Sequence, residues 1–202
     1  MADSARVPAV ILAAGGSMRL GQPKQLLRLR QLDKETLLDR AVTLAAEAGA
    51  DPIFVVLGAN ADEIERGCLL EHCTVLRNAD WAEGMASSLR LGISAIAEQF
   101  PNASGALLMV CDQPALSREH LRRLLDMHGS EPESVAASRY AGRPGVPAIV
   151  PRALFPRLLT LTGDRGARAI FDHAGLRINE TEFPGGEWDI DSPKDIERFR
   201  LG

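Results

Sequence analysis

The sequence predicts an α/β fold, in which one open, mostly parallel sheet is covered by helices on both faces. Short, continuously apolar runs alternate with longer stretches that carry apolar residues at helical spacing. This alternation is typical of strands that are buried on both faces and joined by helical crossovers. The chain has 202 residues, of which 46% are hydrophobic, enough for one well-buried core, and no repeat or low-complexity linker divides it. We therefore expect a single domain, residues 1–202.

The expected strands are apolar runs that end at turn-forming or charged residues. The most convincing is GALLMVCD, which remains apolar until Asp112. A turn-rich AGRPG segment separates two of the later runs. The expected strands span residues 7–13, 52–58, 73–78, 105–112, 134–140 and 146–151, with LRINE (176–180) and EWDID (187–191) as candidate late strands.

Helices are expected between these runs, and two of them carry recognisable end signals. Residues 37–48 have apolar side chains at helical spacing and stop at Gly49, a suitable C-terminal cap. The segment SPKDIERFR offers Ser192 as an N-cap and Pro193 at the first helical position. The remaining expected helices span residues 61–66, 85–97, 117–127, 152–159 and 166–173.

Composition and charge exclude several classes of protein. The formal net charge is −4 and the pI is near 5.6, which argues against a surface that tracks nucleic acid. No stretch is suited to span a membrane, and the N-terminal MADSARVPAV lacks the apolar core and cleavage site of a signal peptide. Cys68, Cys73 and Cys111 form no CxxC pair, so we expect free thiols in a reducing compartment. We predict a cytoplasmic protein that binds neither nucleic acid nor membrane.

The stretch LAAGGSMRLGQPKQLL, residues 12–27, places three glycines, Arg19 and Lys24 behind the first expected strand. In an open parallel sheet, ligands bind beyond the carboxyl ends of the strands. Glycines let consecutive N–H groups turn toward one anion, and the two cations can neutralise a triphosphate. The spacing fits neither the NTPase P-loop nor the dinucleotide fingerprint, because Gln22 stands where the P-loop needs lysine. An ordinary strand-to-helix connection with solvated charges is the alternative.

Acidic residues supply candidates for a metal site. Asp112 ends the best expected strand, which aims its carboxylate at the same edge of the sheet as the glycine loop. Mg²⁺ takes oxygen ligands, usually one or two carboxylates plus substrate phosphates. Asp189 and Asp191 are two residues apart and on a strand would face the same side. A turn or helix cap is the alternative role for Asp112.

The glycine-rich stretch resembles a family signature, L-A-A-G-x-S-x-R-x-G-x-x-K. This signature belongs to nucleotidyltransferases similar to molybdenum cofactor cytidylyltransferase and molybdopterin-guanine dinucleotide synthase. The resemblance continues in NADWAEGMASSLRLG (78–92), VCDQP (110–114), GRPGVPAIVPRALFPRLLTLTGDRGARAIF (142–171) and WDIDSP (188–193), and so covers almost the whole chain. It implies a Rossmann-like sheet of the nucleotide-diphospho-sugar transferase type. It also implies transfer of a nucleoside monophosphate from an NTP.

The resemblance assigns roles to individual residues. Arg19 and Lys24 would be catalytic, with Arg19 at the β- and γ-phosphates and Lys24 bridging toward the α-phosphate. Asp112 and Asp191 would hold Mg²⁺, with Asp189 as the alternative second ligand. The nucleotide would contact Leu12, Ala13, Ala14, Gly15, Gly16, Ser17, Arg19, Lys24, Asn78, Gly84, Ser87, Ser88 and Asp112. The acceptor would contact Gln113, Gly145, Pro147 and Arg168, with salt bridges as the alternative role for Arg165 and Arg168.

Two positions refine these expectations. Many relatives carry histidine where this chain has Val146, which weakens any inference about the acceptor. Met85 and Leu89, at helical spacing in the 78–92 stretch, are expected in the core rather than in the site.

Cytidylyltransferase relatives carry L-A-A-G at the loop, where guanylyltransferase relatives tend toward L-A-G-G. The methyl group of Ala14 leaves less room for a purine, which favours CTP. We therefore predict a Mg²⁺-dependent transfer of CMP from CTP to a phosphorylated acceptor of the molybdopterin type, with release of pyrophosphate. The alternatives are GTP, another phosphorylated metabolite, or a non-catalytic carrier that delivers the cofactor to a molybdoenzyme. Any acceptor-dependent role predicts a cleft beside residues 142–147 that is large enough for a pterin.

Overall fold

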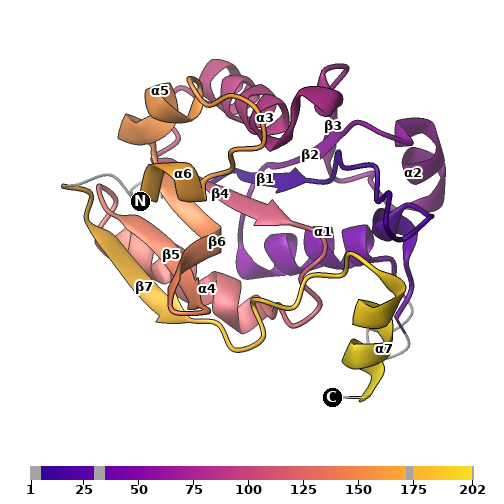
Figure 1. Ribbon diagram of the computed structural model, residues 1–202. Coiled ribbons are helices and arrows are strands. Elements are labelled where there is room, and N and C mark those ends of the chain that lie inside the picture. Colours follow the sequence, from indigo (N-terminus) through magenta and orange to yellow (C-terminus); the bar gives the residue numbers. More distant parts are fainter. Residues whose placement is uncertain (1–5, 30–34, 172–174, 202) are drawn as a thin grey trace.

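The computed structural model describes residues 6–29, 35–171 and 175–201, and these form one sheet between two layers of helices (Figure 1). The strand order is β3-β2-β1-β4-β6-β5-β7. Only β6 runs antiparallel to its neighbours in this part of the chain. The predicted α/β class with a mostly parallel sheet is confirmed. The strands are β1 (Ala9–Leu12), β2 (Ile53–Leu57), β3 (Thr74–Arg77), β4 (Gly105–Val110), β5 (Val135–Tyr140), β6 (Arg143–Pro151) and β7 (Ile178–Glu182).

Two helical layers bury the alternating side chains of the central strands. On one face, Ile11 and Leu107 pack against α1 and α4, and on the other face Val10 and Leu108 pack against α3, α5 and α6. The helices in the described residues are α1 (Leu37–Ala48), α2 (Ala61–Gly67), α3 (Met85–Gln99), α4 (Arg118–Ser130), α5 (Phe155–Leu158), α6 (Arg168–Phe171) and α7 (Pro193–Leu201). Short 3₁₀ turns are η1 (Lys24–Leu26), η2 (Trp81–Glu83) and η3 (Arg152–Leu154).

The predicted C-terminal signal of α1 is confirmed, because Gly49 closes the helix at φ 104°. At the other end the structure adds a cap that was not predicted: Thr36 accepts a hydrogen bond from the backbone N–H of Asp39. α7 begins at Pro193, as its sequence predicts. No helix in the described ranges combines the length and the apolar character needed to cross a membrane. Cys68, Cys73 and Cys111 are free thiols, which confirms that prediction.

Three predicted elements differ from the structure. The AGRPG segment is a tight hairpin turn, in which Ala141 and Gly142 both have positive φ and β6 begins already at Arg143. The expected helix at 152–159 is split into η3 and α5. The expected helix at 166–173 begins at Arg168, and its predicted end at His173 lies outside the described residues.

The prediction of a strand at EWDID is wrong. After β7 the chain turns at Gly185, which has φ 81°, and leaves the edge of the sheet. The segment then crosses the carboxyl end of β4, where the backbone N–H of Ile190 donates to the carbonyl of Asp112 at 3.0 Å. A strand needs a series of backbone hydrogen bonds to a neighbouring strand, and among the described residues this segment makes a single hydrogen bond of that kind, from Ile190 to Asp112. The crossing nevertheless carries Asp189 and Asp191 to the end of the sheet where the glycine loop lies.

Candidate active site

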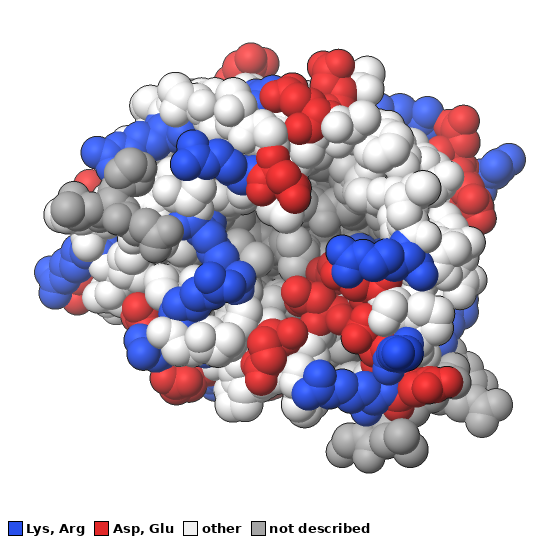
Figure 2. Space-filling view, in the orientation of Figure 1, with Lys and Arg blue, Asp and Glu red and all other residues white. Residues whose placement is uncertain are grey.

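Two adjoining clefts open at the carboxyl ends of β1 and β4. We call the first the glycine-loop cleft: it measures about 300 Å³ and is lined by residues 12–15, Trp81 and Ser88 among others. The second, the Tyr140 cleft, measures about 570 Å³ and is lined by Tyr140, Val146 and Arg168 among others. Figure 2 shows the hollow on this face, with acidic side chains at its edge and basic side chains on opposite sides. Lys24 and Asp112 line both clefts, so the two spaces meet at these residues.

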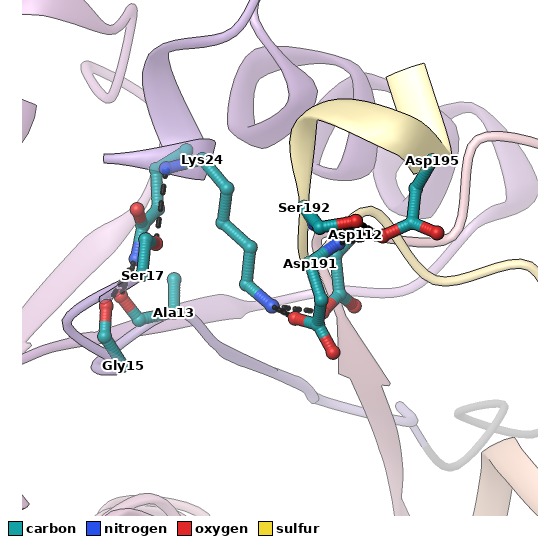
Figure 3. Close-up of polar contacts among 9 residues, drawn as sticks. Ala13, Gly15, Ser17, Lys24, Asp112, Asp191, Ser192 and Asp195 are labelled. Atoms are coloured by element: carbon teal, nitrogen blue, oxygen red, sulfur yellow. Dashed lines mark hydrogen bonds and ion pairs between the residues drawn. The ribbon is translucent and has the colours of Figure 1, made fainter. Parts of the chain in front are cut away.

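Lys24 joins three distant segments of the chain at this meeting point. Its Nζ donates to Oδ2 of Asp112 and, at 2.7 Å, to Oδ1 of Asp191 (Figure 3). Burial favours the neutral amine, but the two carboxylates outweigh burial and raise the pKa of Lys24 above its ordinary value. The side chain therefore stays an ammonium ion at every physiological pH. Both predicted carboxylates and the predicted lysine converge in space.

Asp191 is held in place by a turn at the start of α7. The carboxylate of Asp195 accepts hydrogen bonds from the backbone N–H of Asp191 at 3.2 Å and of Ser192 at 2.7 Å. The Ser192 hydroxyl donates to the same oxygen (Figure 3). The hydroxyl of Ser192 and these backbone groups lower the pKa of Asp195, which keeps it charged. The acidic residue at the third helical position thus fixes the backbone that presents Asp191.

The oxygen atoms at this point fit a hard divalent ion. Oδ1 of Asp112 is buried and has no hydrogen-bond partner among the described residues, so it is free to bind a cation. Asp189 lines the Tyr140 cleft, where burial and the charges of Asp112 and Asp191 raise its pKa to about 6. No group of three or more His, Cys, Asp or Glu side chains in the described ranges could hold a metal by itself. An ion such as Mg²⁺ would therefore need substrate oxygens to complete its shell.

The glycine loop is folded back on itself around a buried glutamine. Ser17 has φ 50°, and its hydroxyl accepts a hydrogen bond from the backbone N–H of Lys24 at 3.1 Å. Gln25, which is fully buried, donates to the carbonyls of Ala13 at 2.6 Å and Gly15 at 3.1 Å. Leu12, Ala13, Ala14 and Gly15 line the glycine-loop cleft, as predicted for nucleotide contacts.

Three other predicted loop residues, Gly16, Ser17 and Arg19, line neither cleft. Gly16 faces Ala59 and the ring of Trp81, where even a Cβ would fit at 3.5 Å. Arg19 is exposed and lines neither cleft.

The start of α3 forms the opposite wall of the glycine-loop cleft. Asn78 donates from Nδ2 to Ser87 Oγ at 2.8 Å and to Ser88 Oγ at 2.9 Å, while its Oδ1 accepts from the backbone N–H of Asp80. Ser87 in turn donates to the carbonyl of Gly84. Asn78 and Ser87 form these hydrogen bonds with other protein groups, whereas Gly84 and Ser88 line the cleft. Asn78 and Ser87 thus hold the start of α3 in place, and Gly84 and Ser88 face the cleft from it.

The prediction that Met85 lies in the core is wrong, while Leu89 is fully buried as predicted. Met85 is the first residue of α3, 42% exposed, and it lines both clefts. Its Sδ would lie 2.5 Å from a Cβ on Gly166, so the glycine lets the Met85 side chain pack against this loop. By helical spacing, Met85 belongs to the apolar face of α3 that packs in the core. Because α3 begins at this residue, its side chain packs instead against the loop around Gly166.

Two loops are interlocked at this wall through their backbones. Gly84 has φ 117°, and a Cβ there would meet the carbonyl carbon of Gly163 at 2.5 Å. The backbone N–H of Ala86 donates to the carbonyl of Gly163 at 3.0 Å. Asp164, next along the second loop, lines both clefts. The α3 wall and the 163–168 loop are thereby fixed relative to each other.

The Tyr140 cleft contains the predicted acceptor residues Gln113 and Arg168. Gln113 donates from Nε2 to the carbonyl of Gly186 at 2.9 Å and of Val146 at 3.2 Å. The guanidinium of Arg168 lies over the Tyr140 ring, 4.8 Å from its centroid, and its Nε is buried without a partner in the described ranges. A cleft of the predicted kind therefore lies beside residues 142–147.

The two other predicted acceptor residues, Gly145 and Pro147, lie behind the side chains that line the Tyr140 cleft. A Cβ on Gly145 would meet Tyr140 Oη at 2.5 Å and Arg168 Nη2 at 2.6 Å, so glycine lets both side chains approach. The carbonyl of Pro147 accepts a hydrogen bond from Ser138 Oγ at 2.6 Å. Arg165 lines the cleft without a salt bridge among the described residues.

Sequence reasoning missed four residues of the site. Trp81 and Asp164 line the clefts from loops, and Tyr140 ends β5 beside Arg168. Gln25 lies directly after Lys24 in the quoted loop, but nothing in the sequence distinguishes it from the other polar residues there. Trp81 stands in the 78–92 stretch and carried a usable signal, because a large aromatic side chain in a polar loop after a strand needs a surface to pack on.

Comparisons with known proteins identify the family of this chain. The sequence profile of the family described as "MobA-like NTP transferase domain" matches residues 9–178. Nicotine blue oxidoreductase of Paenarthrobacter nicotinovorans is 34% identical, over 80% of this chain and 79% of its own. Molybdenum cofactor cytidylyltransferase of Escherichia coli is 26% identical, over 94% of this chain and 93% of its own.

The crystal structure of Rv0371c from Mycobacterium tuberculosis has a TM-score of 0.81 to this fold, with 30% identity, and covers 98% of this chain and 99% of its own. A manganese complex of the same protein has a TM-score of 0.76, with 30% identity over 96% of this chain and 97% of its own. The predicted fold of the nucleotide-diphospho-sugar transferase type is thus confirmed. Together with the geometry of Lys24 and its carboxylates, the profile shows that this chain belongs to the MobA-like NTP transferase family and is a nucleotidyltransferase.

Proposed function

We propose that this protein transfers CMP from CTP to a phosphorylated acceptor of the molybdopterin type and releases pyrophosphate, with Mg²⁺ as cofactor. One observation carries the proposal: the Lys24 ammonium lies between Asp112 and Asp191 where the two clefts meet. A nucleotide in the glycine-loop cleft and an acceptor in the Tyr140 cleft would bring their phosphates together at this point.

In the proposed reaction, an oxygen of the acceptor phosphate attacks the α-phosphorus of CTP. A new phosphorus–oxygen bond forms, the bond from the α-phosphorus to the bridging oxygen of the β-phosphate breaks, and pyrophosphate leaves with that electron pair. Lys24, charged throughout, would lie against the α-phosphate and offset the charge that develops there. Asp112 and Asp191 would hold Mg²⁺, which when bound neutralises phosphate oxygens. Arg19 would approach the β- and γ-phosphates from the exposed face of the loop.

The choice of CTP rests on Ala14, which lines the glycine-loop cleft. Its methyl group narrows the space beside the base, which disfavours a purine. A single methyl group discriminates by about 1–3 kcal/mol, so GTP is the alternative donor. Exchanging Ala14 for glycine should then shift the preference toward GTP by up to about 100-fold.

The choice of acceptor rests on the Tyr140 cleft. Its volume of about 570 Å³ suits a small organic ligand rather than a macromolecule. Tyr140 and Val146 supply flat apolar surface for a ring, and Arg165 and Arg168 supply positive charge for a phosphate. Another phosphorylated metabolite is the alternative acceptor. We also propose a cytoplasmic location, a single domain over residues 1–202, and a molybdoenzyme as the protein that receives the product.

The testing experiment measures pyrophosphate release from each of the four NTPs with Mg²⁺, with and without molybdopterin cofactor. We expect release only with CTP and cofactor together. Lys24→Ala should abolish most of it, and Lys194→Ala, at an exposed lysine of α7, is the matched control. Preferred turnover of GTP would replace the donor, and binding of CTP without release would favour the carrier. A redox reaction in place of pyrophosphate release would favour the chemistry named for nicotine blue oxidoreductase and would overturn the proposal.

A further inference from the structure

Gln25 makes an unusual pair of contacts for a residue beside a catalytic lysine. It is fully buried, at 0% exposure, although glutamine is mostly found at protein surfaces. Its Nε2 donates to two carbonyls in the preceding glycine loop, Ala13 at 2.6 Å and Gly15 at 3.1 Å. One side-chain amide therefore holds the Ala13–Ala14 and Gly15–Gly16 peptide groups.

The orientation of this amide is fixed by its partners. If Nε2 and Oε1 exchanged places, Oε1 would face two carbonyl oxygens and neither could donate. Oε1 is itself buried without a hydrogen-bond partner among the described residues. The protein leaves one acceptor unsatisfied and keeps both donor contacts to the loop.

These contacts determine where the loop directs its N–H groups. In a trans peptide the C=O of one residue and the N–H of the next point in opposite directions. With the carbonyls of Ala13 and Gly15 turned toward Gln25, the N–H groups of Ala14 and Gly16 point away from it. Neither of these N–H groups donates to a protein acceptor within the described ranges. Two backbone N–H groups without a protein acceptor among the described residues thus point away from Gln25, in a loop whose residues 12–15 line the glycine-loop cleft.

We propose that Gln25 is a positioning residue for the transfer reaction. By holding the carbonyls of Ala13 and Gly15, it turns the N–H groups of Ala14 and Gly16 toward the bound nucleotide. This inference rests on the proposed function, because it requires that an NTP occupies the glycine-loop cleft. Gln25 itself does not touch the nucleotide, and Lys24 acts on the phosphates independently of it.

The first test compares steady-state kinetics of Gln25→Met and Gln25→Glu with the wild type. Methionine has similar length and no donor, and glutamate has the same shape with a carboxylate that repels the two carbonyls. We expect the KM for CTP to rise about 10- to 100-fold, the effect of losing hydrogen bonds to a charged ligand. The kcat at saturating CTP should stay close to the wild-type value, because binding and not the chemical step is affected.

The matched control is Gln22→Met, at an exposed glutamine of the same loop, which should leave the KM unchanged. A folded Gln25→Met protein with the wild-type KM would overturn the inference.

A second measurement decides the matter if the Gln25 variants do not fold. In the wild type, saturating CTP should slow amide hydrogen exchange at Ala14 and Gly16, with Gly21 at the far end of the loop as the internal control. Unchanged exchange at Ala14 and Gly16 while CTP binds would overturn the role of Gln25 alone. A wild-type protein that binds no NTP would instead overturn the proposed function.

Discussion

The two clefts of the site differ in the residues that line them. The glycine-loop cleft is lined by the small residues 13–15 and by Trp81 and Ser88, and the side chain of Gln25 holds the loop. The Tyr140 cleft is lined instead by Gln113, Tyr140 and Arg168, which come from three separate segments. Residues 13–15 carry at most a methyl group, so a ligand in the first cleft can approach the loop backbone. In the second cleft larger side chains can be exchanged by single substitutions, so this cleft is where relatives can differ.

The strongest test removes Lys24, the basic residue that lines both clefts. Lys24→Ala should lower kcat by about 10²–10³, the usual cost of losing one preorganised charge partner in an active site. The loss also leaves the carboxylates of Asp112 and Asp191 without their shared cation, so binding in both clefts should weaken. Steady-state kinetics beside Lys194→Ala checks this. Full activity in the Lys24 variant would refute a common reaction point.

Acidification should destabilise the Tyr140 side of the molecule. Behind that cleft, Ser138 donates to the carbonyl of Pro147, so its oxygen accepts from Nε2–H of His120 at 2.7 Å. Arg123 donates to Nδ1 of the same ring, so His120 must be neutral. Burial, and next the charge of Arg123, lower the pKa of His120 to about 4.

Because the folded pKa lies below the unfolded value, the stability that His120 contributes is complete above about pH 6.5 and is lost as the pH falls toward 4. The loss should approach about 3 kcal/mol. Urea unfolding between pH 7 and pH 4.5 measures it, and His120→Gln should flatten the dependence. Burial also lowers the pKa of His128, so His128→Gln is a control for the other buried histidine. Identical slopes in wild type and His120→Gln would contradict the assignment.

A smaller effect should separate the two clefts cleanly. Arg168→Ala should raise the KM for the acceptor about 10-fold through loss of one charged contact, and leave the KM for CTP unchanged. Arg168→Lys should not restore binding, since the guanidinium stacks on the Tyr140 ring. Arg157→Ala, at an exposed arginine of α5, is the matched control. A rise in the KM for CTP alone would mean that Arg168 serves the other cleft.

The smallest expected effect concerns Trp81, an aromatic side chain that lines the glycine-loop cleft. Trp81→Ala should raise the KM for CTP about 3- to 10-fold, as expected for one aromatic contact. In a Trp188→Phe background, Trp81 is the remaining tryptophan, and its fluorescence should change on titration with CTP. Tripolyphosphate, which has no base, should not reproduce the change. An unresponsive signal with CTP bound would place the base elsewhere.

The sequence was sufficient where structure depends on local signals. Strands β1, β2 and β4 are continuous apolar runs, and α1 stops at Gly49, so these elements were predicted to within two residues at each end. The convergence of Lys24 and Asp112 was also predictable, because parallel strands end at the same edge of a sheet.

Contacts between distant segments were not predictable in this way. EWDID has the composition of a strand, but the chain turns at Gly185 and leaves the edge of the sheet before this segment, which pairs with no strand in the described part of the chain. Met85 fits the apolar stripe of α3, yet its partner is Gly166 in another loop. Gln25 looks polar and solvent-facing until the folded loop surrounds it. Each of these depends on a partner far away in sequence, which no local pattern contains.

Lys24 also affects how stable the folded protein is when no divalent ion is bound. Two acidic residues placed this close would ordinarily repel each other, and many proteins rely on a captured ion to relieve that strain. Here the chain supplies its own counter-charge, covalently attached. Treatment with a chelator should therefore abolish activity and leave the melting temperature unchanged. Adding the ion back should restore activity without a refolding step.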